Sequence, residues 1–371
     1  MIWHSYHIKM DGIKDQSLTG FKWSALGESC QTLKLSIIIP VYNVAPYIEA
    51  CLRSVMRQTY TGSMECLIVD DFGTDDSIAI AERTIASYEG PIVFQILHHE
   101  RNRGLSAARN TGTLAAKGDY LYYLDSDDEI TEDCIALLMG KAEEYPEAEL
   151  VQGNFCRHTL TGEETVFVKQ YVLAVASSND DVRKCYYRQT NLAVWNKLIR
   201  RDFLIDHHLF NQEGIIFEDQ LWFFYLLKYL NKACFVSAIT YHWRNRPHSI
   251  TTGTDRATEA YHYAIVYHDI LANLTPGHEQ EEYSFYAKRF CSVLFNYSRF
   301  YSVLEETFLL CCDLSRQYGD VRLRFQLAVY RFLVSFKYGW VVVALWKRVK
   351  KPTIILRDIK RIWRYNREHP Y

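Results

Sequence analysis

Short apolar runs alternate with amphipathic stretches through the first third of the chain. Residues 35–39 read LSIII and end at Pro40, which predicts a strand buried on both faces. The apolar runs 66–71, 91–97 and 119–124 predict three further strands. Between these runs apolar residues recur every three or four positions, which is typical of amphipathic helices. The predicted helices start at Pro46, run from 75 to about 88, and cover 105–117.

This alternation predicts an α/β fold with a mostly parallel sheet flanked by helices, because parallel neighbours need crossover helices. Ligands of such sheets bind beyond the carboxyl ends of the strands. The residues at those ends are largely polar, so we expect the chemistry to lie there. They are Pro40–Asn43, Asp70–Asp71, His98–Arg103 and Asp125–Asp128.

The rest of the chain has a different pattern. Residues 149–250 mix a strand-like run at 150–155 with a helix after Glu218, and the residues beyond Thr254 have mainly helical periods. We therefore predict an N-terminal extension, an α/β domain and a mainly helical C-terminal region. Their predicted limits are 1–33, 34–250 and 251–371.

Composition supports a large buried core and draws attention to the C-terminal tail. The 371 residues are 49% hydrophobic with a net charge of −2, so uniform attraction for nucleic acid is not expected. Residues 321–371, however, carry 13 Lys and Arg against Asp358 and Glu368. The run 339–346 with its flanking Trp and basic residues predicts an interfacial helix on an anionic membrane surface. Alternatively, that run packs on the protein and its basic residues are simply solvated.

Cysteine usage and the chain's apolar runs bear on localisation. None of the ten cysteines forms a C-x-x-C pair, which favours buried thiols in a reducing compartment. The first residues lack the apolar core of a secretory signal, and the longest apolar run, Phe332–Trp346, is too short to span a membrane. We expect a cytoplasmic protein, with the basic tail bringing it to the inner membrane face as a peripheral protein.

Three carboxylates, Asp125, Asp127 and Asp128, directly follow the apolar strand at 119–124. Carboxylates clustered at a strand end repel one another unless a cation or hydrogen-bond donors neutralise them. Magnesium and manganese take such oxygen ligands together with substrate phosphates. An EF-hand is excluded because its sixth and twelfth positions would be Ile130 and Ala136. A helix cap and turn is the alternative interpretation.

Two further segments at this edge have the chemistry of a nucleotide site. Asp70 and Asp71 can accept hydrogen bonds from a base or ribose, or they can form a turn with Gly73. Arg103 and Arg109 lie near a predicted helix start, which suits a phosphate, although a solvated helix cap is an equal alternative.

Taken together, these segments resemble glycosyltransferase family 2, the inverting enzymes of the GT-A fold. The resemblance covers residues 34–250, and 241–251 looks like the closing segment of that domain. It implies a GT-A-type mixed, mostly parallel sheet flanked by helices. The four ordered motifs that carry the resemblance lie at 36–60, 66–77, 101–128 and 216–227.

The resemblance also implies roles for individual residues. Asp125 is expected at the ribose, and Asp127, with Asp125, at a divalent metal (Mn²⁺ or Mg²⁺). His242 is a candidate metal or phosphate contact, or else a packed histidine. Asp219 is the expected general base, with Glu218 as second choice, although the pair can also cap a helix. The residues expected to bind the nucleotide-sugar are Pro40, Tyr42, Asn43, Asp70, Asp71, Arg103, Arg109 and Asp125.

The predicted function is transfer of a sugar, with inversion, from a nucleotide-sugar to a hydroxyl of a glycan or lipid-linked acceptor. The expected donor is a UDP-sugar and the expected process is surface polysaccharide synthesis. A carboxylate must take the proton of the weakly nucleophilic hydroxyl, while a metal and Arg stabilise the leaving diphosphate. The alternative is a catalytically silent nucleotide-binding or scaffold protein. A dehydrogenase is disfavoured because the turn after the first strand has no G-x-G-x-x-G motif, and the chain has no P-loop.

Overall fold

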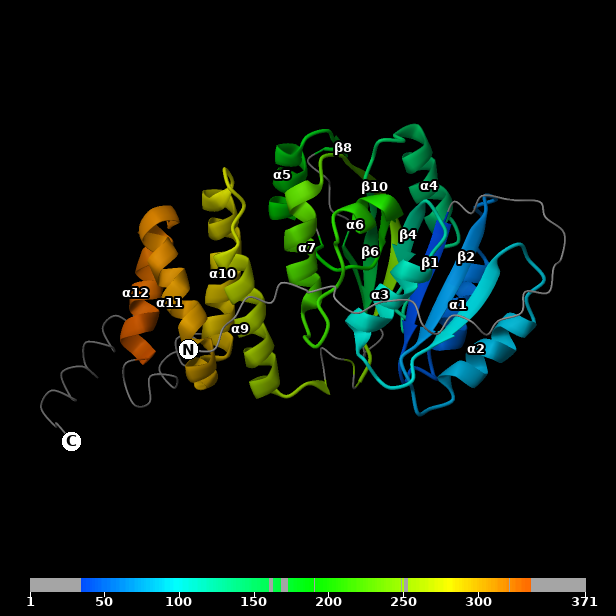
Figure 1. Ribbon diagram of the computed structural model, residues 1–371, viewed down its shortest axis with the longest axis horizontal. Coiled ribbons are helices and arrows are strands. Elements are labelled where there is room, and N and C mark those ends of the chain that lie inside the picture. Colours follow the sequence, from blue (N-terminus) through cyan, green and yellow to red (C-terminus); the bar gives the residue numbers. More distant parts are fainter. Residues whose placement is uncertain are drawn as a thin grey trace, which may run out of the picture. The chain divides into compact units, whose positions relative to one another are not determined.

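A computed structural model describes residues 35–159, 163–167, 173–189, 191–247, 249, 253–319 and 321–334 (Figure 1). The predicted N-terminal extension 1–33 lies outside the described residues. So do residues 335–371, which hold most of the predicted basic tail.

The first four described strands form the parallel part of the sheet. The strands β1 (Leu35–Val41), β2 (Met64–Asp70), β3 (Val93–His98) and β4 (Tyr120–Tyr123) lie in the order β3-β2-β1-β4. The crossovers are α1 (Ile48–Met56), α2 (Ser77–Ala86) and α3 (Leu105–Ala115). All seven residues of β1 are buried, as its unbroken apolar run predicts. The predicted strands and helices of this part are therefore confirmed.

Antiparallel neighbours extend the sheet beyond β4. The order continues β4-β9-β6-β10-β5, with β6 and β10 parallel to each other and the other pairs antiparallel. The additional strands are β5 (Glu129–Ile130), β6 (Leu150–His158), β7 (Glu164–Phe167), β8 (Val175–Ala176), β9 (Lys197–Arg200) and β10 (Ala233–Arg244). The described helices that accompany them are α4 (Cys134–Glu144), α5 (Asn179–Gln189), α6 (Arg201–Asp206) and α7 (Glu218–Tyr229).

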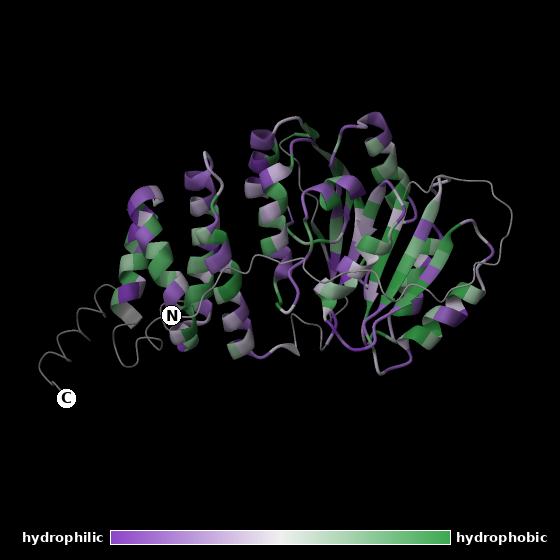
Figure 2. Ribbon diagram, viewed as in Figure 1, coloured by the Kyte–Doolittle hydropathy of each residue, from purple (hydrophilic) through white to green (hydrophobic). Residues whose placement is uncertain are grey.

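The sheet has an apolar core on each face because side chains alternate along a strand. Ile37 and Ile39 of β1 belong to a core that includes residues of α1 and α4. Ile38 belongs to a second core that includes most of the buried face of α7. On this second face Gly112 of α3 lies so close to Ile38 that a β-carbon there would overlap it. Figure 2 shows the apolar residues concentrated in the strands and on the inward faces of the helices.

The second core continues into the helical C-terminal region. The described helices there are α9 (Arg256–Ala272), α10 (Glu279–Asn296), the short 3₁₀ turn η1 (Ser298–Phe300), α11 (Tyr301–Tyr318) and α12 (Val321–Val334), which confirms the predicted helical character. Tyr225 of α7 donates to Asp269 of α9 at 2.6 Å, and Arg183 of α5 makes a fully buried ion pair with Glu282 of α10. No described helix is both long enough and apolar enough to cross a membrane.

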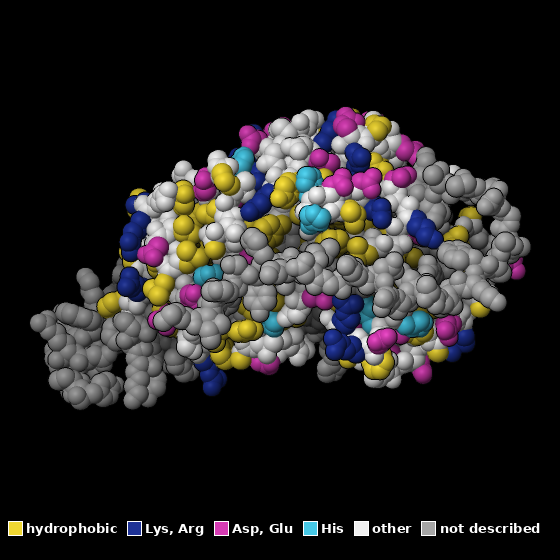
Figure 3. All heavy atoms as spheres, in the orientation of Figure 1, with side chains coloured by type: hydrophobic (Ala, Val, Ile, Leu, Met, Phe, Trp, Pro, Cys, Tyr) yellow, Lys and Arg dark blue, Asp and Glu magenta, His cyan; other side chains and the backbone are white. Residues whose placement is uncertain are grey.

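Helix α12 is part of this core, although the predicted basic tail starts at its first residue. Leu323, Leu327 and Tyr330 are buried. On the face shown in Figure 3, described Lys and Arg side chains are spread among acidic ones rather than gathered in one patch. The basic residues 347–367, on which the membrane prediction depends, lie outside the described residues.

Candidate functional site

One buried arginine joins two of the predicted motifs, 101–128 and 216–227. Arg109 of α3 donates to Asp125, directly beyond β4, at 2.8 Å and to Glu218, the first residue of α7, at 2.7 Å. The Arg109 side chain is 3% exposed, so its charge depends on these two carboxylates for compensation. Tertiary structure thus brings together residues that lie as much as 109 positions apart.

The other two acids after β4 are bound by the end of β10 and the residues after it. Arg246 contacts Asp127 at 2.5 Å. Asp128 is buried and accepts hydrogen bonds from the Tyr241 hydroxyl and the Arg244 N–H, both at 2.7 Å. Burial, together with the neighbouring carboxylates, raises the pKa of Asp127 and raises that of Asp128 well above its usual range. The cluster of acids therefore favours a nearby cation.

The acids at the end of β2 have two different environments. Both carboxylate oxygens of buried Asp71 accept hydrogen bonds from the protein. The donors are the Gly104 N–H at 2.7 Å and the Arg103 N–H at 2.8 Å, and the His99 ring lies 2.7 Å away. Gly104 has a φ of +89°, which a glycine adopts without strain. Asp71 therefore holds the start of α3. Its predicted contact with the nucleotide stays a prediction.

Asp70 lies nearer the open edge. It accepts from the Gly73 N–H at 3.2 Å and lies 3.0 Å from His98. The next residue in this turn, Thr74, donates its N–H to the Asn43 side chain at 2.8 Å, which joins the ends of β1 and β2. Asp70 and Asn43 thus form one edge, as the motifs predict.

Two aromatic side chains stand exposed at this edge. Tyr42 is 46% exposed and Phe72 is 53% exposed. The predicted binding residue Pro40 is buried within β1, whereas Arg103 points to Glu213 at 3.2 Å and is partly exposed. The edge therefore offers flat apolar faces beside Asp70, which is suited to an aromatic base.

Glu218 and Asp219, the Glu-Asp pair at the start of α7, have different surroundings. Phe217, directly before it, has a φ of +63°, a strained conformation for a large side chain. Its ring stacks on Tyr263 of α9 at 4.0 Å with the planes 8° apart. This turn directs Glu218 to Arg109, whereas Asp219 makes no ion pair within 4 Å in the described part of the chain. Strain next to the pair is typical of a functional position.

Asp219 is held in an enclosed and weakly compensated setting. Its carboxylate accepts a hydrogen bond from the Gln220 N–H at 2.8 Å. Burial, and after it the charge of Glu218, raises the pKa of Asp219 to about 7. Fully buried Lys197, whose own pKa burial lowers to about 7, provides a partly compensating charge nearby and donates to the Ala193 carbonyl. A carboxylate titrating near neutrality is suited to general-base catalysis.

Asp219 also lines a cavity of about 570 Å³ between the α/β domain and the C-terminal helices. The C-terminal side contributes Tyr263 and Tyr267 of α9, and Arg289 of α10. A volume of this size accommodates one or two sugar rings. A larger hollow of about 1030 Å³ around α10 contains none of the predicted site residues.

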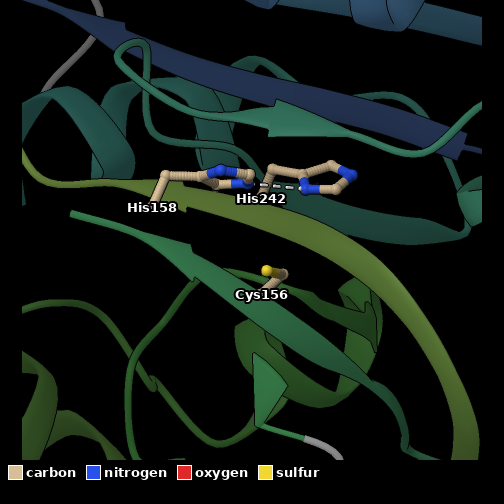
Figure 4. Close-up of side chains that lie close together, drawn as sticks. All are labelled: Cys156, His158 and His242. Atoms are coloured by element: carbon tan, nitrogen blue, oxygen red, sulfur yellow. Dashed lines mark hydrogen bonds between the residues drawn. The ribbon is translucent and has the colours of Figure 1, made fainter. Parts of the chain in front are cut away.

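The predicted metal ligands fit a divalent ion only in part. Asp125 and Asp127 offer carboxylate oxygens, which Mg²⁺ and Mn²⁺ prefer, and Asp127 gains from a cation because burial opposes its charge. His242 is grouped elsewhere: its Nδ1 lies 2.9 Å from Nε2 of His158, beside Cys156 (Figure 4). A contact of His242 with the metal of Asp127 therefore stays a prediction.

Two residues of the site, Arg246 and Phe72, were given no role of their own from the sequence. Arg246 belongs to the closing segment 241–251, and Phe72 lies between Asp71 and Gly73 inside the motif at 66–77. Nothing local marks the partner of Arg246. Lys197, by contrast, belongs to the segment 195–197, which the sequence offers as a lining of the acceptor side.

The chain is similar in sequence to known glycosyltransferases. Residues 36–207 match the family described as Glycosyl transferase family 2. Glycosyltransferase GlyA of Streptococcus pneumoniae is 40% identical over 123 residues, which cover 33% of this chain but only 17% of GlyA. Glycosyltransferase GlyG of the same species is 27% identical over 225 residues, 58% of this chain and 72% of GlyG.

Solved structures extend the similarity beyond the matched sequence. Residues 1–349 of S. aureus TarS, in complex with UDP-GlcNAc, align with a TM-score of 0.66 at 20% identity, covering 85% of this chain and 92% of that one. The mannosyltransferase PcManGT from Pyrobaculum calidifontis, in complex with GDP-Man and Mn²⁺, aligns with a TM-score of 0.52 at 14% identity, covering 88% and 90%. At these identities the likeness establishes the fold, and it confirms the predicted GT-A class.

Proposed function

The chain belongs to glycosyltransferase family 2 through residues 36–207, and from this premise we propose that it transfers a sugar, with inversion, from a nucleotide-sugar to an acceptor hydroxyl. A UDP-sugar is the proposed donor, and a glycan or lipid-linked chain of a surface polysaccharide the proposed acceptor. TarS was solved with UDP-GlcNAc, which supports the choice of nucleotide.

The donor is proposed to bind along the carboxyl ends of β1, β2 and β4. Tyr42 and Phe72 would stack on the base, and Asp70 with Asn43 would accept its polar hydrogens. Asp125, held by Arg109, would face the ribose. The support is that these side chains already share one edge, and that Arg109 and Arg246 supply positive charge beside it.

A divalent ion, Mn²⁺ or Mg²⁺, is proposed to be held by Asp127 with help from Asp125, and when bound it would neutralise the charge of the diphosphate. PcManGT was solved with Mn²⁺, which supports this choice. Arg246, which pairs with Asp127, would also contact the diphosphate oxygens.

Asp219 is proposed as the general base. Glu218 forms an ion pair with Arg109, whereas Asp219 lines the cavity. The pKa of Asp219, about 7, lets it accept a proton near neutral pH. It would take the proton of the acceptor hydroxyl as that oxygen attacks the anomeric carbon from the face opposite the diphosphate. Lys197 would limit the rise in the pKa of Asp219.

The acceptor is proposed to enter the cavity of about 570 Å³ between α7 and the helices α9 and α10. Tyr263, which is partly exposed and lines this cavity, would contact a sugar ring. Arg289, exposed at the same cavity, would favour an acceptor that carries negative charge. On this proposal the C-terminal helices contribute to acceptor choice.

The observation that carries the proposal is the bridge by which Arg109 links Asp125, the first acid after β4, to Glu218 of the Glu-Asp pair. The test is release of nucleoside diphosphate from UDP-GlcNAc, UDP-glucose, UDP-galactose and GDP-mannose by full-length protein, with and without Mn²⁺. We expect metal-dependent release with one of these donors. Binding of donors without release in any condition would instead identify a silent nucleotide-binding protein.

We also propose that the basic residues 347–367 bring the enzyme to an anionic membrane that carries a lipid-linked acceptor. This proposal rests on the sequence. Because Leu323 and Tyr330 of α12 are buried, the suitable truncation is after Val334. Salt-sensitive co-sedimentation with anionic vesicles that is lost on this truncation would support the proposal. Equal binding of both forms would contradict it.

A further inference from the structure

A cysteine and two histidines form a compact group on one face of the sheet. Strands β6 and β10 are parallel, and their register pairs Cys156 with His242 and His158 with Arg244. Paired residues in a sheet, and residues two apart along a strand, project to the same face. Cys156, His158 and His242 therefore share one face (Figure 4).

Their ligand atoms are close enough to share one ion. Nε2 of His158 lies 2.9 Å from Nδ1 of His242, and these atoms and the Cys156 sulfur all lie within 4.8 Å of one another. A tetrahedral zinc ion places nitrogen and sulfur ligands about 3.3–3.7 Å apart. Small side-chain shifts are therefore sufficient. In the described part of the chain no other group of three or more such side chains meets this distance limit.

A fourth side chain orients the group. Strand β7 pairs with β6 so that Glu164 lies opposite His158, and its carboxylate is 3.3 Å from the His158 Nδ1. A carboxylate on one ring nitrogen fixes the histidine and directs the other nitrogen to a metal. The His158 side chain is 21% exposed and Cys156 is 3% exposed, so an ion can reach the histidines while the thiol is shielded from solvent.

We propose that Cys156, His158 and His242 bind one Zn²⁺ ion, with water in the fourth position and Glu164 holding His158. Sulfur and imidazole ligands favour zinc over the Mg²⁺ or Mn²⁺ that the oxygen ligands Asp125 and Asp127 suit. The ion would link β10 to β6. His242 lies shortly before Arg244 and Arg246, which contact Asp128 and Asp127. The link would therefore help to hold the loop after β4 in place.

The test uses metal-depleted full-length protein titrated with Co²⁺, a spectroscopic substitute for zinc. We expect one equivalent to give the near-ultraviolet thiolate–cobalt band together with the intense visible bands of a tetrahedral site, and Zn²⁺ to abolish both. Cys156→Ser should remove the thiolate band. His158→Gln and His242→Gln should each weaken binding at least tenfold, and Glu164→Gln should weaken it by roughly tenfold or more.

Matched variants separate this site from other thiols and from the oxygen ligands. Cys66→Ser changes a buried thiol on β2, and Asp127→Asn changes the proposed diphosphate metal ligand; both should leave the cobalt bands unchanged. Absence of a stoichiometric band in the unaltered protein, or a band that survives Cys156→Ser, would overturn the proposal. Loss of the band in Asp127→Asn would instead assign His242 to the diphosphate metal. None of these readouts depends on sugar transfer.

Discussion

The two sides of the proposed catalytic centre are built in opposite ways. The donor side comes from consecutive short segments between Val41 and Asp128, and its charged groups are paired, as in Arg109 with Asp125 and Arg246 with Asp127. The acceptor side is assembled from distant segments, and its carboxylate, Asp219, has no such ion pair among the described residues. Arg246 opposes the rise that burial causes in the pKa of Asp127, so this acid is suited to binding a cation. Asp219 has no such ion-pair partner, and its pKa, raised to about 7, suits it to exchanging a proton.

This contrast is tested most strongly at the start of α7. In Asp219→Asn we expect turnover to fall roughly 10²–10⁴-fold, because the amide keeps the shape but accepts no proton. Donor affinity, measured by calorimetry with Mn²⁺, should stay nearly unchanged. Glu218→Gln is the matched control. If that variant loses turnover on this scale while Asp219→Asn stays active, the roles within the pair are reversed.

On the donor side, Asp127→Ala should remove the Mn²⁺-dependent part of nucleoside diphosphate binding and leave the fold intact. Arg246 would then lose its carboxylate partner but remain available to the diphosphate. Titration of UDP with and without Mn²⁺ measures the effect. Asp206→Ala, at the exposed end of α6, is the control. Unchanged metal-dependent affinity in Asp127→Ala would show that the ion is held elsewhere.

Replacing each of two buried arginines separates an ion pair proposed to act at the donor site from one that only stabilises the fold. Arg109→Met leaves Asp125 and Glu218 without their cation, and Arg183→Met leaves Glu282 buried and unpaired between α5 and α10. Each should lower the free energy of unfolding by about 3–5 kcal/mol. Only Arg109→Met should also impair donor binding, as measured below the unfolding transition. Equal kinetic damage in both would contradict the assignment of Arg109 to the donor side.

The pH dependence of turnover tests whether Asp219 is the titrating base. Because the base must be deprotonated, kcat should rise about tenfold per pH unit below the Asp219 pKa of about 7 and level off above it. Lys197→Met removes a nearby positive charge that favours the carboxylate, so the rise should move to higher pH. A profile that is flat between pH 5 and 8 would exclude Asp219 as the titrating base.

Local pattern accounts for the parallel half of the fold. The apolar run at 35–39 predicts a strand directly, because a strand buried on both faces is apolar along its length. The spacing of three and four residues after it predicts a helix, because only one face of a crossover helix packs on the sheet. The antiparallel additions β5, β7 and β8 are only two to four residues long, too short for a periodic signal. The zinc candidate was missed for a related reason, since Cys156 and His242 meet only through the pairing of β6 with β10.

The sequence by itself determined which residue types stand at the strand ends, because those positions follow directly from short loops after buried strands. It therefore placed Asp70, Asp125 and Asp127 at strand ends, and the resemblance to the family added the Glu-Asp pair at a helix start. Tertiary structure alone decided what each of them faces. Glu218 and Asp219 are adjacent in the chain, yet the left-handed turn at Phe217, stacked on Tyr263, sends one to Arg109 and leaves the other at the cavity. Their difference in charge compensation arises from packing between distant segments, and no local pattern encodes it.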